Sequence, residues 1–114
     1  MGDRRMVKLI NIDGEVFYVY SHWEGYKLPE IVETALNSDK AMGRLIDGPY
    51  WTRIMIDQIT KSARDSEGGY GIMLSPMGED QYFSNNPSII VDVPNNRFTV
   101  YPEEIQKKIH SNRE

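Results

Sequence analysis

The chain has no cysteine among its 114 residues. Thiol nucleophiles, disulfide cross-links, iron–sulfur clusters and cysteine-ligated zinc are therefore excluded, and a cytosolic location is favoured. The sequence also lacks any apolar run near the about 18 residues that a membrane-spanning helix needs. We therefore expect no membrane segment.

Basic residues are scarce relative to acidic ones. Thirteen Lys and Arg stand against seventeen Asp and Glu, which gives a net charge of −4 and a pI of about 5.2. A protein that binds nucleic acid without sequence preference needs a basic face to neutralise phosphates. This charge balance argues against that function, but it allows a protein partner or a small ligand held by a few local basic groups.

The length predicts a single domain over residues 1–114, with residues 1–5 and 110–114 as flexible tails. Residues 7–12 and 15–21 read as two strands around Asp13-Gly14, a pair that is typical of a type I′ hairpin turn. Both faces of the second strand carry apolar groups, so we expect it in the middle of a sheet. Residues 88–93 and 97–101 predict a second hairpin.

Three helices are expected between and around these strands. Pro29 and Pro49 suit first helical turns, and residues 39–46 predict a short helix between the two. A core-facing stripe marks the second Pro helix and comprises Trp51, Ile54, Met55, Ile59 and Ala63. Residues 64–71 read as a loop and 72–74 as a short strand. A last short helix is predicted from Pro102, with Ile105 and Ile109 on its apolar side.

This order of elements predicts an α+β fold. We expect an antiparallel sheet built from hairpins, with two or three helices packed on one face.

The segment Tyr20-Ser21-His22-Trp23-Glu24-Gly25-Tyr26 joins a predicted strand to a predicted helix. Such junctions readily display binding groups on a rigid scaffold. His22 is the only histidine outside the charged C-terminal tail, so it is the natural candidate for a general acid or base. The simpler interpretation, a histidine hydrogen-bonded at a strand end, is favoured. With no second such histidine and no cysteine, no metal site is predicted.

Further candidates lie outside this segment. Tyr50 and Tyr70 are aromatic rings near predicted loop and helix ends, where they can stack on a base or anchor a partner. Arg53 lies on the polar side of its helix and can fork onto a phosphate or carboxylate, or remain a solvated arginine. Trp51 also lies in that helix, but its position favours the core.

Asp92 interrupts an apolar strand and would orient His22 if the two hairpins were neighbours. No nucleophile elbow and no paired-carboxylate motif is present. An enzyme is therefore not favoured, and no cofactor is implied.

An ordered set of short motifs runs through much of the chain: Tyr18-Val19-Tyr20-Ser21-His22-Trp23-Glu24-Gly25-Tyr26, Leu28-Pro29, Tyr50-Trp51-Thr52-Arg53-Ile54, Gly69-Tyr70-Gly71-Ile72 and Ile89-Ile90-Val91-Asp92-Val93. Together they resemble a family of small proteins of unknown function that phages and other mobile elements encode. The resemblance implies a protein made in the bacterial host cytoplasm. It also implies an accessory role against host defences, usually exerted by binding.

The functional prediction is therefore a counter-defence binding protein. It would sequester a nucleotide-like immune signal or mask a host defence protein. The predicted ligand-binding residues are His22, Trp23, Tyr26, Tyr50, Arg53 and Tyr70. One alternative is a small hydrolase or phosphodiesterase that uses His22 as acid–base, with Asp92 or Tyr26 assisting. A homo-oligomer whose aromatic residues form its interface is a further alternative.

Overall fold

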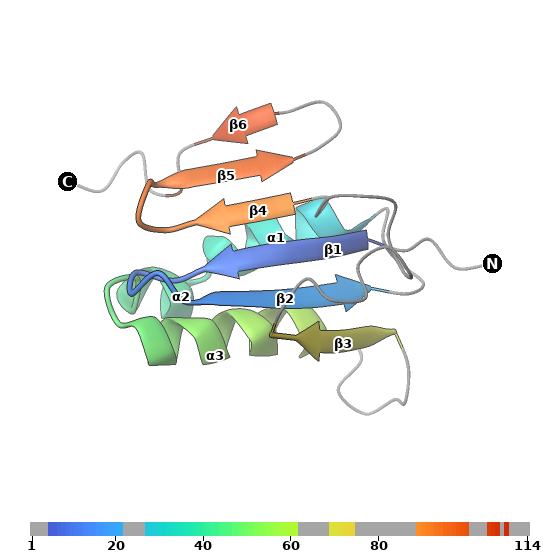
Figure 1. Ribbon diagram of the computed structural model, residues 1–114, viewed down its shortest axis with the longest axis horizontal. Coiled ribbons are helices and arrows are strands. Elements are labelled where there is room, and N and C mark those ends of the chain that lie inside the picture. The colour runs from blue at the N-terminus through green and yellow to red at the C-terminus, as the bar shows by residue number, and fades with distance from the viewer. Residues whose placement is uncertain are drawn as a thin grey trace.

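The computed structural model describes residues 5–21, 27–61, 69–74, 89–100, 105–107 and 109. Six strands and three helices follow one another along this part of the chain (Figure 1). Their order is β1 (Arg5–Ile10), β2 (Val16–Ser21), α1 (Leu28–Leu36), α2 (Asp39–Gly43), α3 (Gly48–Thr60), β3 (Tyr70–Met73), β4 (Ile89–Asp92), β5 (Arg97–Val100) and β6 (Ile105–Lys107).

All six strands belong to one sheet, in the order β3-β2-β1-β4-β5-β6. The predicted α+β fold is confirmed, both predicted hairpins form, and β2 lies inside the sheet as expected. The sheet is nevertheless mixed, because β1 and β4 pair in parallel. Parallel neighbours need a long crossover connection, whereas turn signals in a sequence report only strands that are joined directly. The predicted antiparallel sheet built from hairpins is therefore confirmed only in part.

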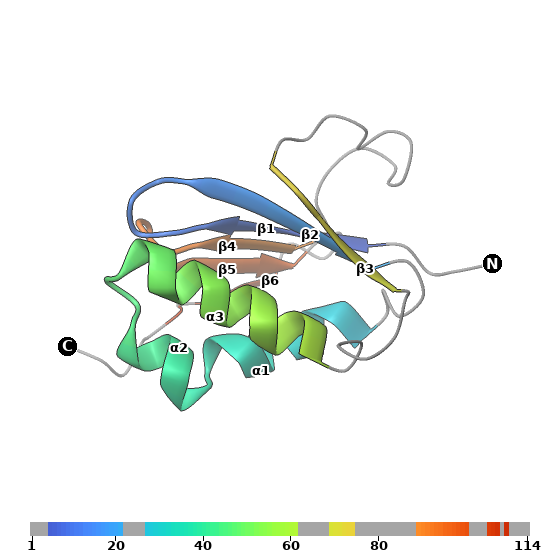
Figure 2. The same ribbon diagram turned by 90° about the horizontal axis from the view of Figure 1, so that it is seen from below.

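The three helices lie together on one face of the sheet (Figure 2). Between the two layers lies the main core, to which β1 contributes Val7 and Leu9 and α3 contributes Trp51. Four residues of the predicted α3 stripe are buried as expected: Trp51, Ile54, Met55 and Ile59. Ala63 lies outside the described residues. The opposite face of the sheet carries a smaller apolar cluster built around Met6 and Tyr18.

Two local predictions were wrong. Residues 105–107 form β6 instead of a helix, and they pair with β5. The open edge of β5 offers unpaired backbone groups, and satisfying them outweighs a weak helical preference. Tyr70 and Gly71 belong to β3 instead of a loop. An added Cβ at Gly71 would overlap the ring of Tyr20, which lies across this edge strand.

The β1–β2 turn differs from the predicted type I′ turn. A type I′ turn needs positive φ at both central residues, and only Gly14 has it here, at 83°. The connection is wider than two residues: the amide of Asn11 donates to the carbonyl of Glu15 at 3.0 Å. The amide of Gly14 donates in turn to the carbonyl of Asn11 at 2.9 Å.

The side chain of Asn11 organises this wider turn and ties it to α3. Asn11 is completely buried, and its Oδ1 accepts from the amides of Asp13 and Glu15, both at 3.0 Å. Its Nδ2 donates to Glu15 Oε1 at 3.0 Å and to Thr52 Oγ1 at 2.9 Å. Thr52 Oγ1 donates onward to the carbonyl of Gly48 at 2.7 Å. We call this network the Asn11 junction.

Replacing Asn11 by Ala is expected to lower the free energy of unfolding by about 3 kcal/mol, because several buried partners lose their bonds together. Urea unfolding measures the change. Asn95→Ala is the control, since Asn95 is exposed and, among the described residues, bonds only within the β4–β5 turn. It should cost about 1 kcal/mol or less. Equal losses in the two variants would contradict the role of the junction.

Gly48→Ala should destabilise the fold for a steric reason. An added Cβ would overlap the carboxylate of Asp13 and lie 3.3 Å from Asn11 Nδ2. We expect a loss of about 1–3 kcal/mol by urea unfolding. Gly43→Ala is the matched control, because nothing lies within 4 Å of its added Cβ. Alanine there should be neutral or stabilise α2 by up to about 1 kcal/mol, and a Gly48→Ala protein of wild-type stability would refute the close approach.

Candidate functional site

The central candidates from the sequence, His22, Trp23 and Tyr26, lie outside the described residues. The residues on either side of them are described: Ser21 ends β2 and Lys27 precedes α1. Ser21 pairs with Arg5 on one side and with Tyr70 on the other. We call this end of the sheet the loop end. Tyr70 therefore lies at the loop end, where it is half-buried against the main core.

Tyr50 and Arg53 lie elsewhere. Tyr50 is in the first turn of α3, which the Asn11 junction holds against the β1–β2 turn. We call this opposite end of the sheet the hairpin end. Tyr50 is 54% exposed, and the guanidinium carbon of Arg44 lies 4.7 Å from its ring centroid. Arg53, one turn further on, is exposed, and no hydrogen bond or ion pair joins it to another described residue.

The structure thus separates the predicted site into two places. Tyr70 and the flanks of residues 22–26 lie at the loop end, whereas Tyr50 is at the hairpin end. Since α3 has 13 residues, it extends about 20 Å between the two ends. Tyr50 and Tyr70 are therefore not parts of one small pocket.

Asp92 also lies at the hairpin end. The two hairpins are neighbours, as the orienting hypothesis required, because β1 pairs with β4. Asp92, however, aligns with Ile10, whereas Ser21 aligns with Arg5. At about 3.3 Å per residue, these positions are separated by about 17 Å along the strands. The Asp92 carboxylate accepts hydrogen bonds from the amide of Asn95 at 3.3 Å and from Asn95 Nδ2 at 2.8 Å. It therefore stabilises the β4–β5 turn.

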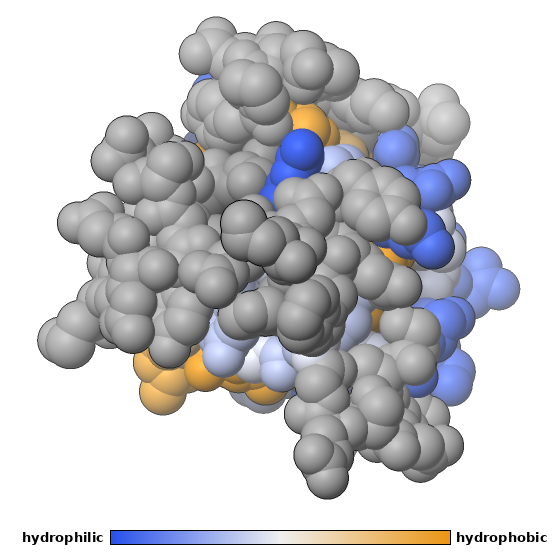
Figure 3. All heavy atoms as spheres, turned by 90° about the vertical axis from the view of Figure 1, so that its right-hand side faces the viewer, coloured by the Kyte–Doolittle hydropathy of each residue, from blue (hydrophilic) through white to orange (hydrophobic). Residues whose placement is uncertain are grey.

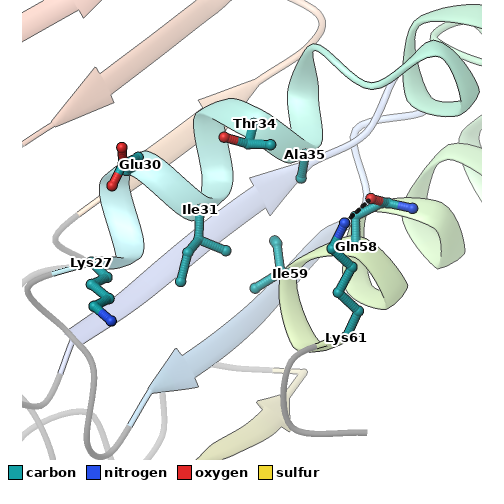
Figure 4. Close-up of a pocket in the computed structure, with 8 residues that line it drawn as sticks. All are labelled: Lys27, Glu30, Ile31, Thr34, Ala35, Gln58, Ile59 and Lys61. Atoms are coloured by element: carbon teal, nitrogen blue, oxygen red, sulfur yellow. Dashed lines mark hydrogen bonds between the residues drawn. The ribbon is translucent and has the colours of Figure 1, made fainter.

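A groove between α1 and α3 opens toward the loop end, with a volume of about 360 Å³ (Figure 4). One wall of the groove is a single face of α1 together with the residue that precedes the helix. Its residues are Lys27, Glu30, Ile31, Thr34 and Ala35. This spacing of i, i+3, i+4, i+7 and i+8 marks a single side of a helix. The end of α3 supplies the other wall with Gln58, Ile59 and the following Lys61.

The groove combines an apolar floor with a basic and polar rim. Ile31 and Ile59 point toward each other from the two helices, while Lys27 and Lys61 extend from opposite walls (Figure 4). Lys61 Nζ lies 3.4 Å from Gln58 Oε1, to which it donates. An ammonium group on each wall above apolar side chains suits an anion that also has a flat apolar part.

The start of α1 brings backbone amides and the Glu30 carboxylate to the same end of the groove. The Lys27 side chain makes no capping hydrogen bond to the helix that it precedes. The first amide groups of a helix carry a partial positive charge and favour nearby anions. Hydrophilic side chains also gather along the helix side of this end of the molecule (Figure 3).

Arg53 is not part of this groove. Arg53 and Gln58 are five positions apart in α3, which corresponds to a rotation of about 140° around the helix axis. It therefore lies on another flank of α3 than the groove wall.

The sequence did not single out Lys27 or Lys61. Each stands just outside a helix, and only the antiparallel packing of α1 and α3 brings the two walls together. The repeat of polar and apolar groups at 27, 30, 31, 34 and 35 was the available signal. It was hidden because Ile31 and Ala35 also fit an ordinary core stripe.

In the part of the chain that the structure describes, no group of three or more His, Asp or Glu side chains could hold a metal ion. Among the same residues, no helix has the length and apolar character needed to span a bilayer. Comparison with protein-family models, curated proteins and solved structures finds no match to this chain.

Proposed function

We propose that this protein acts by binding, and that it sequesters a small nucleotide-like anion in the α1–α3 groove. The observation that carries the proposal is the pair Lys27 and Lys61 on opposite walls above the apolar floor of Ile31 and Ile59. In a chain with a net charge of −4, such a local basic pair is what an anionic ligand requires.

Each part of a nucleotide has a counterpart in the groove. Lys27 and Lys61 suit a phosphate. The partly exposed side chain of Ile31 provides an apolar surface for the base, and the buried Ile59 supports it from below. Glu30, Thr34 and Gln58 offer acceptors and donors for the sugar hydroxyls and base edges.

The size of the groove narrows the choice of ligand. Its volume of about 360 Å³ is near the small end of the range for ligand pockets, about 300–1,000 Å³. One nucleotide unit therefore fits better than a complete dinucleotide. Trp23 and Tyr26 precede Lys27 by only four and one residues, so the chain tethers them within about 14 Å of it. They are the natural source of aromatic contacts to a part of the ligand outside the groove.

Binding alone would meet the accessory role that the sequence resemblance implies. A phage or mobile-element protein in the bacterial host cytoplasm can counter a defence by holding its nucleotide signal, and no catalytic group is needed. The ligand should therefore be recovered unchanged. Chromatography after incubation checks this, and conversion of the ligand would support the hydrolase alternative instead.

Ligand affinity should depend on the two lysines. Calorimetric titration with adenosine monophosphate, ADP-ribose and cyclic dinucleotides should identify at least one ligand, and Lys27→Ala or Lys61→Ala should weaken it about tenfold. Lys40→Ala is the matched control, because Lys40 is an exposed lysine of α2 that does not line the groove. It removes the same charge and should change affinity about twofold or less.

Two results would refute the proposal. Absence of binding by every probe would remove the nucleotide class as ligand. An equal loss of affinity in Lys27→Ala, Lys61→Ala and Lys40→Ala would show general charge attraction without a site. Arg53→Ala adds a further distinction: a loss restricted to that variant would move the site to the other flank of α3.

A further inference from the structure

A second surface lies at the hairpin end, away from the lysines of the groove. Three large apolar side chains are exposed there: Ile12 at 37%, Ile46 at 84% and Tyr50 at 54%. Beside Ile46 is a hollow of about 520 Å³, between Asp13 of the β1–β2 turn and the segment 43–49. A projecting apolar side chain and a hollow are therefore neighbours on one surface.

The same surface carries exposed charges of both signs, Asp13 and Arg44. The Asp13 carboxylate lies over the backbone of Gly48, and no described residue donates a hydrogen bond to it. Arg44 Nη1 donates to Asp47 Oδ2 at 3.4 Å, yet the Arg44 side chain remains 52% exposed. Because a guanidinium has five N–H donors, Arg44 retains the capacity for another carboxylate.

We infer that the hairpin-end surface, defined by Ile12, Asp13, Arg44, Ile46 and Tyr50, binds a second copy of the chain. A two-fold interface must be self-complementary, so that residue i meets residue j and j meets i. This surface meets the requirement twice. Ile46 of each copy enters the hollow of the other, and Arg44 of each copy pairs with Asp13 of the other.

The dimer should be weak and reversible. Stable interfaces bury about 800 Å² on each partner, and the hairpin-end surface consists of one turn and one helix junction. Tyr50 and Arg44, already held together by their stacking, are residue types that dominate binding energy at interfaces. Dimerisation is therefore expected at micromolar concentrations.

Analytical ultracentrifugation of the full chain from about 5 µM to about 500 µM tests the inference over the range of a small interface. The average mass should rise from 13.2 kDa toward twice that value. Ile46→Asp should remain monomeric throughout. Leu74→Asp is the control, since Leu74 is 72% exposed and does not line the hollow. It should dimerise like the wild type.

A charge swap distinguishes the proposed Arg44–Asp13 contacts from non-specific association. Asp13→Arg alone and Arg44→Asp alone should each weaken dimerisation about tenfold or more, because like charges then meet across the axis. The double variant should recover most of the wild-type association. Circular dichroism and a melting curve check that each variant is folded. If Ile46→Asp does not fold, the charge-swap variants still test the proposed interface.

Either of two outcomes overturns the inference. A wild-type chain that stays at 13.2 kDa at every concentration has no such dimer, and the surface would then be free for a different partner. A dimer that survives Ile46→Asp but is lost in Leu74→Asp would place the interface at the β3 edge instead.

Discussion

The fold depends most on the Asn11 junction. A buried amide is costly unless its donors and acceptors are matched, and Asn11 has a partner for each of four hydrogen bonds. Three of them lie within the β1–β2 turn, and the fourth reaches across to Thr52 of α3. One residue thereby sets both the conformation of a turn and the position of the helix layer relative to the sheet.

The groove follows from this anchoring. Because the start of α3 is held against the β1–β2 turn, its end is carried to the opposite end of the sheet, beside the start of α1. Lys61 then lies across from Lys27, although the two residues are far apart in sequence. The close approach of Gly48 to Asp13 is a second consequence, and a residue with a Cβ at position 48 would displace the Asp13 carboxylate. The proposed ligand groove and the proposed dimer surface thus lie at the two ends of one rigid helix.

Turn residues and hydrophobic periodicity predicted the elements that short-range interactions determine. The Asp13-Gly14 and 94–96 turns marked both hairpins, and the Trp51 stripe marked the buried face of α3. The strand at 105–107 pairs with the preceding strand β5, and its Ile105 and Ile109 spacing was misread as a helical stripe. The parallel β1–β4 pair and the facing lysines depend instead on partners distant in sequence. Periodicity and turn residues carry no information about such partners. The grouping of Tyr50 and Tyr70 into one site was misleading for the same reason.

The most direct test of the account is an NMR titration of the labelled protein with the tightest-binding probe among adenosine monophosphate, ADP-ribose and cyclic dinucleotides. Amide shift changes should concentrate in residues 27–35 and 58–61, with little change at Asp13, Arg44 and Tyr50. Changes centred on Tyr50 and Arg53, or no saturable change at any amide, would contradict a ligand site between α1 and α3.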